Sequence, residues 1–484
     1  MVTLRPYQES AIRELAARIA AGRRRIVVVA ATGSGKTVIF ARVVADAVAL
    51  GQPVLVVAHR RELIQQTYEK LLRAGLDARQ VGVLMADDAR RRPTAHVQVA
   101  SIDTLRHRPK PPAALVIVDE AHRELARSYR EMRAHYPDAV HLGFTATPYR
   151  ADNRGLGEFY DDLLLVASIG ALIVQGYLVE PRVFTVPTDR LPDLSRVRVR
   201  AGDYAQDQLD QAVDQAPLVG DIIEHWKKHA VGLRTVAFAV SVKHSRHIAE
   251  RFREAGLPAE HLDGTTPLPE RDAMLGRLER GDTLVVSNCG VLCEGWDQAS
   301  VKCAILARPT KSTGLYLQQA GRILRPWQGA RAVILDHAGC AREHGLPQDE
   351  REFSLEPKPK RRRGEAIEVP IRVCDGCQAV LPARVRVCPE CGFFFTEERP
   401  VPTEVEGQLV EAKAGDAAGA PGDRQSGRKS KVEGDRALQR ATFEQLRALA
   451  RAQRRDEAWA RERFIERYGA PPPPEWVESA WGSL

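Results

Sequence analysis

Short runs rich in β-branched residues alternate with helical stretches along the first part of the chain. This alternation is typical of a parallel sheet covered by helices, because each buried parallel strand needs a crossover connection before the next. The predicted strands are residues 26–30, 54–58, 97–100, 115–118 and 140–144.

The alternation becomes less regular after Pro148, and a polar, helix-prone stretch follows over about 202–229. A second α/β unit then begins, because short apolar runs again alternate with helical stretches. Its predicted strands are residues 235–240, 259–262, 283–287, 301–306 and 332–335. We therefore predict two α/β units in tandem, residues 1–180 and 181–345.

The composition changes after residue 356. A basic run (Lys358, Lys360 and Arg361 to Arg363) precedes a four-cysteine segment at 366–398, and residues 399–434, rich in Gly, Ala, Asp and Pro, are predicted to be a flexible linker. Residues 435–484 are predicted to form a small helical tail. Its apolar positions recur at helical spacing or supply aromatic area: Phe443, Leu446, Leu449, Ala450, Trp459, Phe464, Tyr468 and Trp476.

Size and composition indicate a multidomain globular protein. The 484 residues exceed a common single domain, and 44% of them are hydrophobic. The net charge of +8 makes a polyanion a plausible partner. We expect no membrane span, because no apolar run approaches the necessary length, and no export, because the N-terminus resembles no signal peptide. With the cysteine pattern, this predicts a cytoplasmic location.

A glycine-rich loop joins the strand at 26–30 to a predicted helix. Glycines let backbone N–H groups approach a phosphate, and the helix N-terminus adds a positive dipole end. Lys36 is predicted to reach the β- and γ-phosphates of a nucleotide, and the Thr37 hydroxyl to hold magnesium. Ala30 stands where the strict pattern has Gly, a minor departure. The predicted phosphate-binding residues are Thr32, Gly33, Ser34, Gly35, Lys36 and Thr37.

Asp119 and Glu120 follow the apolar strand at 115–118. Their carboxylates should therefore project at the C-terminal edge of a parallel sheet, where ligands bind. We predict that Asp119 coordinates magnesium and that Glu120 orients or deprotonates the attacking water.

Taken in order, these motifs resemble those of the superfamily 2 helicases of the DEAD/DEAH type over about residues 3–340. The resemblance implies two RecA-like lobes that bind ATP between them. Leu4-Arg5-Pro6-Tyr7-Gln8 is similar to the adenine-reading segment, with Gln8 as the base contact. The segments 57–63 and 100–105 resemble motifs that grip the phosphates of a nucleic-acid strand, and 143–148 resembles the motif that couples hydrolysis to movement.

Two segments of the second lobe carry further resemblance. Residues 286–297 are similar to the motif whose Gly295 and Asp297 touch nucleotide and strand. Residues 318–325 match Gln-x-x-Gly-Arg-x-x-Arg, with Gln318, Arg322 and Arg325. A fixed guanidinium can stabilise charge on a transferring phosphoryl group. Helical spacing predicts that both arginines lie on one face and reach the same phosphate.

The start of the chain, residues 307–318 and a cysteine cluster after 334–339 resemble the RadD (YejH) group of bacterial and phage helicases. That resemblance implies an ATP-dependent DNA helicase or translocase associated with DNA repair or recombination. Three alternatives stay open: an RNA helicase, the motor subunit of a restriction or defence complex, and a DNA-binding scaffold that does not hydrolyse ATP.

Four cysteines form two Cys-x-x-Cys units separated by ten residues: Cys374, Cys377, Cys388 and Cys391. Four thiolates suit a closed, structural zinc site. Basic residues near these units have two equally favoured interpretations, a nucleic-acid contact or a solvated linker. They are Arg372, Arg384, Arg386 and the basic run. The tail could equally dock a protein partner or clamp nucleic acid.

Several other residues are predicted to be structural. Cys289, Cys293, Cys303 and Cys340 lie in or near predicted strands and should be small core residues. Trp226 and Tyr204 could stack on bases, although packing is the favoured role. His244 and His247 are predicted to lie on a helix surface.

Overall fold

The computed structural model spans all 484 residues and divides into two compact units, one containing Met1–Val373 with Gln378–Ala383 and the other Cys374–Cys377 with Arg384–Leu484. The structure describes residues 3–86, 88–123, 127–148, 155–186, 191–200, 202–213, 216–293, 295–356, 371–395, 443, 446, 447, 450, 456–468 and 471–477. The basic run at 358–363, the predicted linker at 399–434 and Leu449 lie outside the described residues.

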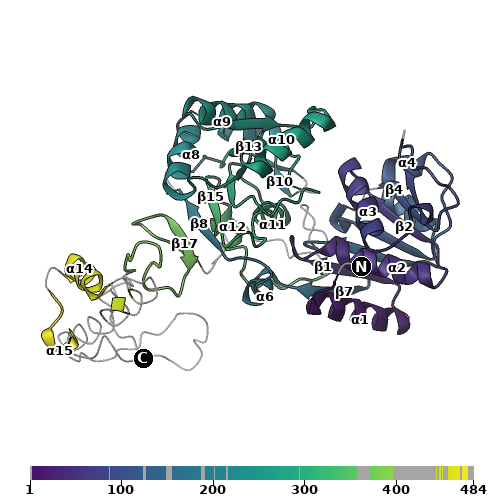
Figure 1. Ribbon diagram of the computed structural model, residues 1–484, viewed down its shortest axis with the longest axis horizontal. Coiled ribbons are helices and arrows are strands. Elements are labelled where there is room, and N and C mark those ends of the chain that lie inside the picture. Colours follow the sequence, from purple (N-terminus) through teal and green to yellow (C-terminus); the bar gives the residue numbers. More distant parts are fainter. Residues whose placement is uncertain are drawn as a thin grey trace, which may run out of the picture. The chain divides into compact units, whose positions relative to one another are not determined.

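The first lobe of the larger unit is built on a seven-stranded sheet in the order β3-β4-β2-β5-β6-β1-β7, with every pair parallel (Figure 1). This confirms the predicted parallel sheet. Its strands are β1 (Arg25–Ala30), β2 (Val54–Ala58), β3 (Val81–Leu84), β4 (Val97–Ser101), β5 (Leu115–Asp119), β6 (Val140–Thr145) and β7 (Asp162–Ala167).

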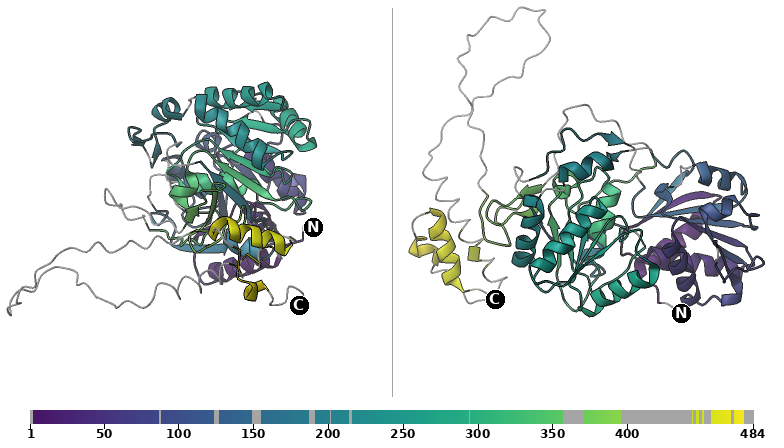
Figure 2. Two further views of the ribbon diagram at one scale, coloured as in Figure 1. Left: turned by 90° about the vertical axis from the view of Figure 1, so that its left-hand side faces the viewer. Right: turned by 90° about the horizontal axis from the view of Figure 1, so that it is seen from above.

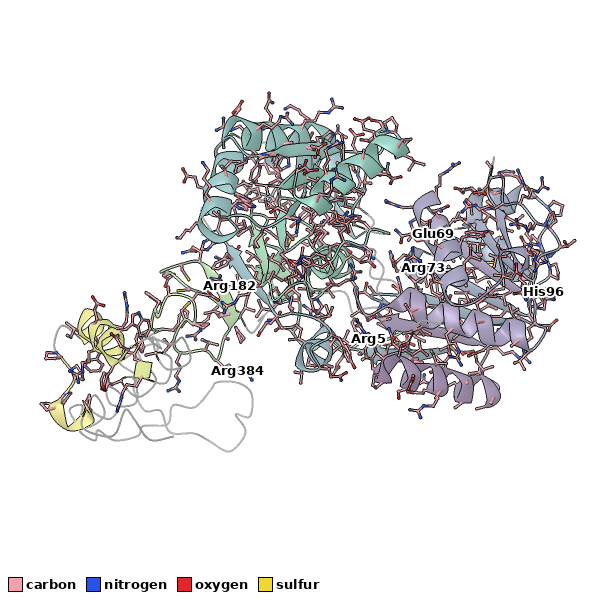
Figure 3. The ribbon with its side chains drawn as sticks, in the orientation of Figure 1. Arg5, Glu69, Arg73, His96, Arg182 and Arg384 are labelled. Carbon is pink, nitrogen blue, oxygen red and sulfur yellow. The ribbon has the colours of Figure 1, made fainter. Side chains whose placement is uncertain are left out.

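Helices cover both faces of this sheet, because alternate residues of each buried strand point to opposite sides. Val54 and Val56 of β2 pack in one apolar cluster with α1, α2 and α3, whereas Leu55 and Val57 pack in another with α4 and α5. Glu69 and Arg73 form an exposed ion pair on α3, on the face away from the sheet (Figure 3). The helices are α1 (Pro6–Ala20), α2 (Lys36–Ala49), α3 (Arg61–Arg73), α4 (Ile102–Arg106), α5 (Arg127–Ala134) and α6 (Ile169–Val174), with short 3₁₀ turns η1 (Ala78–Gln80) and η2 (Ala121–Arg123).

The second lobe, teal to green in Figure 2, contains a sheet of eight strands in the order β12-β13-β11-β14-β15-β8-β17-β16. Its first six strands are parallel, and β17 and β16 extend it as an antiparallel hairpin beside β8. The strands are β8 (Pro181–Thr185), β11 (Thr235–Phe238), β12 (Ala259–Leu262), β13 (Val285–Asn288), β14 (Cys303–Leu306), β15 (Ala332–Asp336), β16 (Ile371–Val373) and β17 (Ala379–Pro382).

Helices also flank the second sheet. Apolar residues of α10, α11 and α12 pack on one side of it, while α8 and α9 pack against β12, β13 and β15. A separate two-stranded ribbon, β9 with β10, stands beside α7. These elements are α7 (Gln206–Val213), α8 (Ala216–His229), α9 (Val242–Glu254), α10 (Leu268–Arg280), α11 (Thr313–Gly321), α12 (Cys340–His344), β9 (Val199–Arg200) and β10 (Asp203–Tyr204).

The smaller unit combines the cysteine cluster with tail helices α14 (Glu457–Tyr468) and α15 (Pro474–Val477). Phe464 of α14 and Trp476 of α15 are buried in an aromatic core with Phe443, and Phe394 of the cysteine segment packs against the same core. The cysteine segment and the tail therefore share one core.

Five of the residues predicted to be structural are buried: Trp226, His244, Cys293, Cys303 and Cys340. Trp226 is buried, and its indole N–H donates to the Thr235 hydroxyl at 2.7 Å. Cys303 is also buried. The surface position predicted for His244 is wrong, because α9 turns this residue inward and leaves it 1% exposed. No helix among the described residues is both long and apolar enough to cross a membrane.

Candidate active site

The phosphate-binding loop predicted from the sequence lies between β1 and α2. Gly33 and Gly35 have φ angles of +87° and +79°, a backbone conformation that residues with a Cβ adopt only with strain. A Cβ at Gly35 would also lie 2.5 Å from Gln8 Nε2. The loop therefore takes its shape through these glycines, and α2 begins at Lys36 with its N-terminus at the loop.

Gln8 is fastened to this loop. Its side-chain amide donates to the Ser34 carbonyl at 2.9 Å, and its Oε1 accepts from the Arg5 backbone N–H at 2.9 Å. The Tyr7 hydroxyl donates to the same Ser34 carbonyl at 2.6 Å. Both polar atoms of the Gln8 side chain thus bind the protein. The N-terminal segment is therefore hydrogen-bonded directly to the loop.

Lys36 and two carboxylates form the buried centre of the site. Lys36 Nζ lies 3.1 Å from Asp119 Oδ1 and forms a short ion pair with Glu120. Burial acts to lower the pKa of Lys36, but the nearby charges of Asp119 and Glu120 outweigh it and raise the pKa above its usual value. Burial raises the pKa of Asp119. The ammonium therefore compensates both buried negative charges.

Glu120 is held in a strained backbone conformation, with a φ of 57° that is uncommon for a residue with a side chain. Its Oε2 lies 3.3 Å from His122 Nδ1 and accepts a hydrogen bond of 3.4 Å from Gln318 Nε2. His122 Nδ1 in turn lies 3.2 Å from the hydroxyl of Thr145, at the end of β6. Glu120 is therefore contacted by residues of both lobes.

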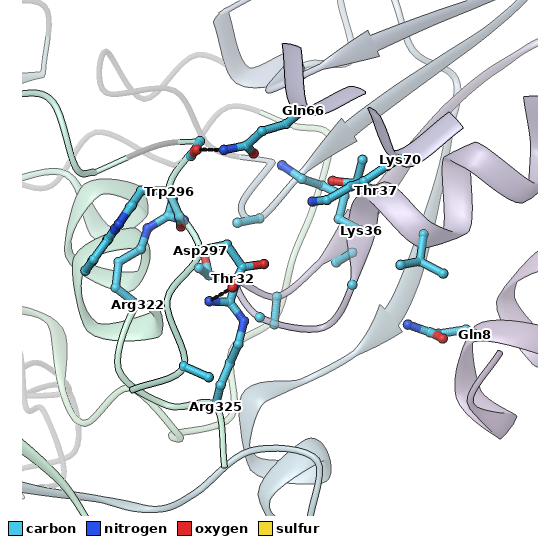
Figure 4. Close-up of a pocket in the computed structure, with 18 of the residues that line it drawn as sticks. Gln8, Thr32, Lys36, Thr37, Gln66, Lys70, Trp296, Asp297, Arg322 and Arg325 are labelled. Atoms are coloured by element: carbon cyan, nitrogen blue, oxygen red, sulfur yellow. Dashed lines mark hydrogen bonds and ion pairs between the residues drawn. The ribbon is translucent and has the colours of Figure 1, made fainter. Parts of the chain in front are cut away.

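The two arginines predicted to share a helical face do not share one, because α11 ends at Gly321 and Arg322 is its C-cap. The Arg322 guanidinium donates to the backbone carbonyls of Cys293 and Trp296 and is 7% exposed. Arg325 instead pairs with Asp297 at 2.5 Å (Figure 4). Arg322 thus fixes the loop after β13, and Arg325 faces the pocket.

A pocket of about 540 Å³ opens between the lobes, a volume within the range of small-molecule sites. Both lobes contribute to it, and Figure 4 shows Gln8, Lys36 and Thr37 on one side with Asp297, Arg322 and Arg325 on the other. The predicted residues that line it are Gln8, Thr32, Gly33, Gly35, Lys36, Thr37, Asp119, Glu120, Gly295, Asp297, Arg322 and Arg325. Ser34 and Gln318 are buried behind its surface.

The lobes approach each other closely where Gly321 meets the phosphate-binding loop. A Cβ placed on Gly321 would lie 2.4 Å from Thr32 Cβ and 2.8 Å from Thr32 Cγ2. Other contacts cross the same cleft: Arg60 donates to the Gly290 carbonyl at 3.2 Å, and Gln66 donates to the Gly295 carbonyl.

Lys302 was missed by reasoning from the sequence. It directly precedes the strand β14, is 1% exposed, and donates to the carbonyls of Ile323 and Arg325. Burial lowers its pKa to about 8. It therefore anchors the turn that carries Arg325. The sequence did contain a sign of this role, because Lys302 is the charged residue of an otherwise apolar predicted strand.

The four predicted zinc-ligating cysteines come together in the smaller unit. Their sulfur atoms all lie within 4.8 Å of one another, with Cys374 Sγ 3.5 Å from Cys391 Sγ and Cys377 Sγ 3.6 Å from Cys388 Sγ. Tetrahedral zinc with bonds of about 2.3 Å requires sulfur separations of roughly 3.8 Å. The cluster is therefore compatible with a zinc ribbon.

Comparisons with known proteins agree with this geometry. Residues 1–150 match the family model "Type III restriction enzyme, res subunit", and residues 217–326 match "Helicase conserved C-terminal domain". A 51.5 kDa protein of a Lactococcus phage is 32% identical over 380 residues, which cover 78% of this chain and 80% of the phage protein. A Saccharomyces cerevisiae protein named as a candidate ATP-dependent helicase, IRC3, is 32% identical over 66% of this chain and 49% of its own length.

A solved fragment of a candidate HsdR subunit of a type I restriction enzyme, from Vibrio vulnificus YJ016, has the same fold. It has a TM-score of 0.57 and 19% identity, and the similarity covers 74% of this chain and 68% of the fragment. The two α/β units are thus tandem RecA-like lobes. The chain belongs to the superfamily 2 helicases of the DEAD/DEAH type. Members of this class are nucleic-acid-dependent ATP hydrolases.

Proposed function

We propose that the chain couples ATP hydrolysis to movement along DNA, as a helicase or translocase in DNA repair or recombination. The observation that carries the proposal is the double contact at Glu120, where Lys36 of its own lobe and Gln318 of the other lobe both reach the carboxylate. A change in the separation of the lobes must change the surroundings of this group. Hydrolysis and lobe movement are thereby coupled at one side chain.

The residues around the pocket fit a nucleotide with its magnesium ion. In the proposed site the loop from Thr32 to Thr37 and the Lys36 ammonium bind the phosphates, while the Thr37 hydroxyl and Asp119 hold magnesium. The ion supplies positive charge against the phosphate oxygens when it is bound. Glu120 accepts a proton from the attacking water. Gln8 contacts the adenine base through hydrogen-bonding capacity beyond its contacts with the loop.

Arg325, and not Arg322, is proposed to stabilise the charge that develops on the transferring phosphoryl group. Arg325 lines the pocket, and a Cβ on Gly33 would lie 3.7 Å from its Cγ, so this side chain crosses directly over the phosphate-binding loop. Arg322 is occupied by two backbone carbonyls. Its proposed contribution is to hold Gly295 and Asp297 at the pocket.

DNA is favoured over RNA as the polymer. The family model that matches the first lobe is named for restriction enzymes, whose substrate is DNA. The net charge of +8 suits either polymer. A role as the motor subunit of a restriction or defence complex is the second candidate, supported by the same name.

The cysteine cluster is proposed to hold one structural zinc ion, because four convergent thiols lie at separations that suit tetrahedral ligation. Thiolates bind metal only while they stay reduced, which supports the proposed cytoplasmic location. The proposed role of the ribbon and helical tail is to contact DNA or a protein partner.

Steady-state ATPase rates with magnesium test the proposal, measured without polymer and with single-stranded DNA, double-stranded DNA or RNA of matched sequence. We expect a low basal rate that DNA raises strongly and RNA raises less. Lys36→Met should abolish the stimulated rate, because it removes the phosphate contact. Arg42→Gln is a control, since Arg42 is exposed and pairs with Asp46 on the outer side of α2.

The alternatives predict different outcomes. Stimulation by RNA above that by DNA would identify an RNA helicase, and DNA binding without turnover would identify a scaffold. Strong ATPase that leaves a DNA duplex intact while displacing a bound protein would identify a translocase without unwinding activity.

A further inference from the structure

Three arginines of the second lobe stand close together in sequence, in an exposed segment that has no assigned role. Arg196, Arg198 and Arg200 are exposed and alternate with Val197 and Val199. Arg196 lies in a turn, Arg198 lies outside regular structure, and Arg200 lies in the strand β9. Every second position of this short segment thus carries a guanidinium group. We call residues 196–200, which lead into β9, the arginine strand.

The arginine strand is held firmly at the lobe. The backbone N–H of Arg198 donates to Gln208 Oε1 at 2.9 Å, and its carbonyl accepts from Ala205 N at 2.8 Å. Val197 packs against the apolar cluster that contains Leu209 and Val240. The arginines therefore project from a fixed backbone, which lowers the entropy lost when they bind a ligand.

The ribbon that follows is also tied down. Arg200 of β9 and Asp203 of β10 are cross-strand neighbours in the backbone register. The Asp203 carboxylate accepts hydrogen bonds from the Thr310 hydroxyl at 2.9 Å and the Lys311 backbone N–H at 2.8 Å. β10 is labelled in Figure 1. Both ends of the arginine strand thus have anchors in the second lobe.

The charges of these arginines are available to a ligand. None of the three takes part in an ion pair within the part of the chain that the structure describes. Asp193, three residues before Arg196, accepts a hydrogen bond from Ser195 N, and the charge of Arg196 contributes to lowering its pKa. Asp203, three residues after Arg200, is bound by Thr310 and Lys311 and pairs with Arg308 at 3.7 Å. Three guanidinium groups in a row with so little compensation form a site for a polyanion.

The position of the strand agrees with this ligand. Val240, on which the strand packs, lies two residues beyond the end of β11, and Thr310 and Lys311 follow the end of β14. Both anchors are therefore at the carboxyl edge of the parallel strands, where open α/β sheets bind ligands. Gly295 and Asp297 follow β13 at the same edge and line the nucleotide pocket.

We infer that the arginine strand binds the phosphate backbone of the nucleic-acid strand on which the motor moves, without reading its sequence. This inference rests on the proposed function and adds a second-lobe contact to it. Guanidinium groups bind phosphate oxygens in a bidentate manner, and contacts to phosphate alone position a protein without specifying bases.

The test compares the wild type with a triple Gln variant at Arg196, Arg198 and Arg200. The affinity for a fluorescent single-stranded oligonucleotide is measured at several salt concentrations. Each lost phosphate contact lowers the slope of log affinity against log salt by about 0.7 for a single strand, so the slope should fall by about 2. Affinity at low salt should fall at least about tenfold.

Two further variants complete the design. A control with Arg13, Arg23 and Arg42 changed to Gln loses the same charge from exposed positions on the first lobe and should keep the wild-type slope. A variant with Arg196→Lys, Arg198→Lys and Arg200→Lys should keep most of the wild-type slope, because lysine keeps the charge. Basal ATPase without polymer should be unchanged in all three, since these residues do not line the pocket.

The possible failures are distinguishable. A wild type whose ATPase does not respond to any nucleic acid would overturn the proposed function itself. A responsive wild type with equal salt slopes in the triple variant and the control would overturn only the assignment of the arginine strand. A lysine variant that behaves like the Gln variant would contradict binding through phosphate charge.

Discussion

Replacing Gly321 by Ala should stop the motor without weakening its fold. The added Cβ would lie 2.4 Å from Thr32 Cβ, whereas ordinary contacts begin near 3.4 Å, so the lobes must separate by about 1 Å at this point. The helix itself should tolerate Ala, which is favoured over Gly in helices by about 1 kcal/mol. The conflict therefore exists only when the lobes approach each other.

A displacement of about 1 Å at reacting groups can cost roughly a hundredfold in rate. We therefore expect the DNA-stimulated kcat of Gly321→Ala to fall about a hundredfold, while the thermal unfolding midpoint stays equal or rises slightly. Gly276→Ala in α10 is the matched control, because its Cβ would meet only the flexible end of Arg280, at 3.3 Å. A Gly321→Ala enzyme with a kcat within twofold of this control would refute the reasoning.

Four further variants test other parts of the molecule. Glu120→Gln should bind ATP normally but hydrolyse it about 10² to 10⁴ times more slowly, as seen by nucleotide binding and single-turnover rates. Arg325→Ala should lower kcat at least about a hundredfold with little change in nucleotide affinity. Burial lowers the pKa of His337 to about 3 from 6.5, so the wild type should lose stability as pH falls from about 6.5 toward 3, and His337→Gln should flatten this loss in thermal unfolding. Cys388→Ser should lose zinc in elemental analysis and destabilise the smaller unit, while basal ATPase persists.

Clear results would contradict each expectation. Equal losses of ATP binding and hydrolysis in Glu120→Gln would assign this residue to structure, and a pure affinity defect would remove Arg325 from the chemistry. If wild type and His337→Gln lose stability equally as the pH falls, a group other than His337 would be responsible for the loss. If carefully prepared wild-type protein contains no zinc, the proposal that the four cysteines hold zinc would be overturned.

The sequence was most informative where a pattern reflects burial. Strands such as β2 and β5 are buried on both faces and therefore appear as continuous apolar runs, which is why the two parallel sheets were predictable. Strand β7 was missed because only one of its six residues is buried. The strand β8 was missed as well, since it lies far in sequence from its neighbour β15 and pairs with it only in the folded lobe.

Motif residues were predictable as a set, but their contacts were not. The pattern around Arg322 and Arg325 gave no sign that α11 ends at Gly321, because the end depends on how the chain turns against Lys302. The inward position of His244 likewise depends on the tertiary packing of α9. Local spacing identifies chemistry, whereas the direction of a side chain follows from long-range contacts.

The ion pairs of Lys36 have a consequence for the order in which ligands can enter. While its ammonium neutralises Asp119 and Glu120, a magnesium ion that arrives alone meets a carboxylate already satisfied and a positive charge beside it. A bound nucleotide would attract the ammonium toward its phosphates, and Asp119 would then be free to hold a magnesium ion in the proposed site. Lys36 would therefore compete with a free metal ion for these carboxylates. We expect the enzyme to bind free magnesium weakly and the magnesium–nucleotide complex tightly.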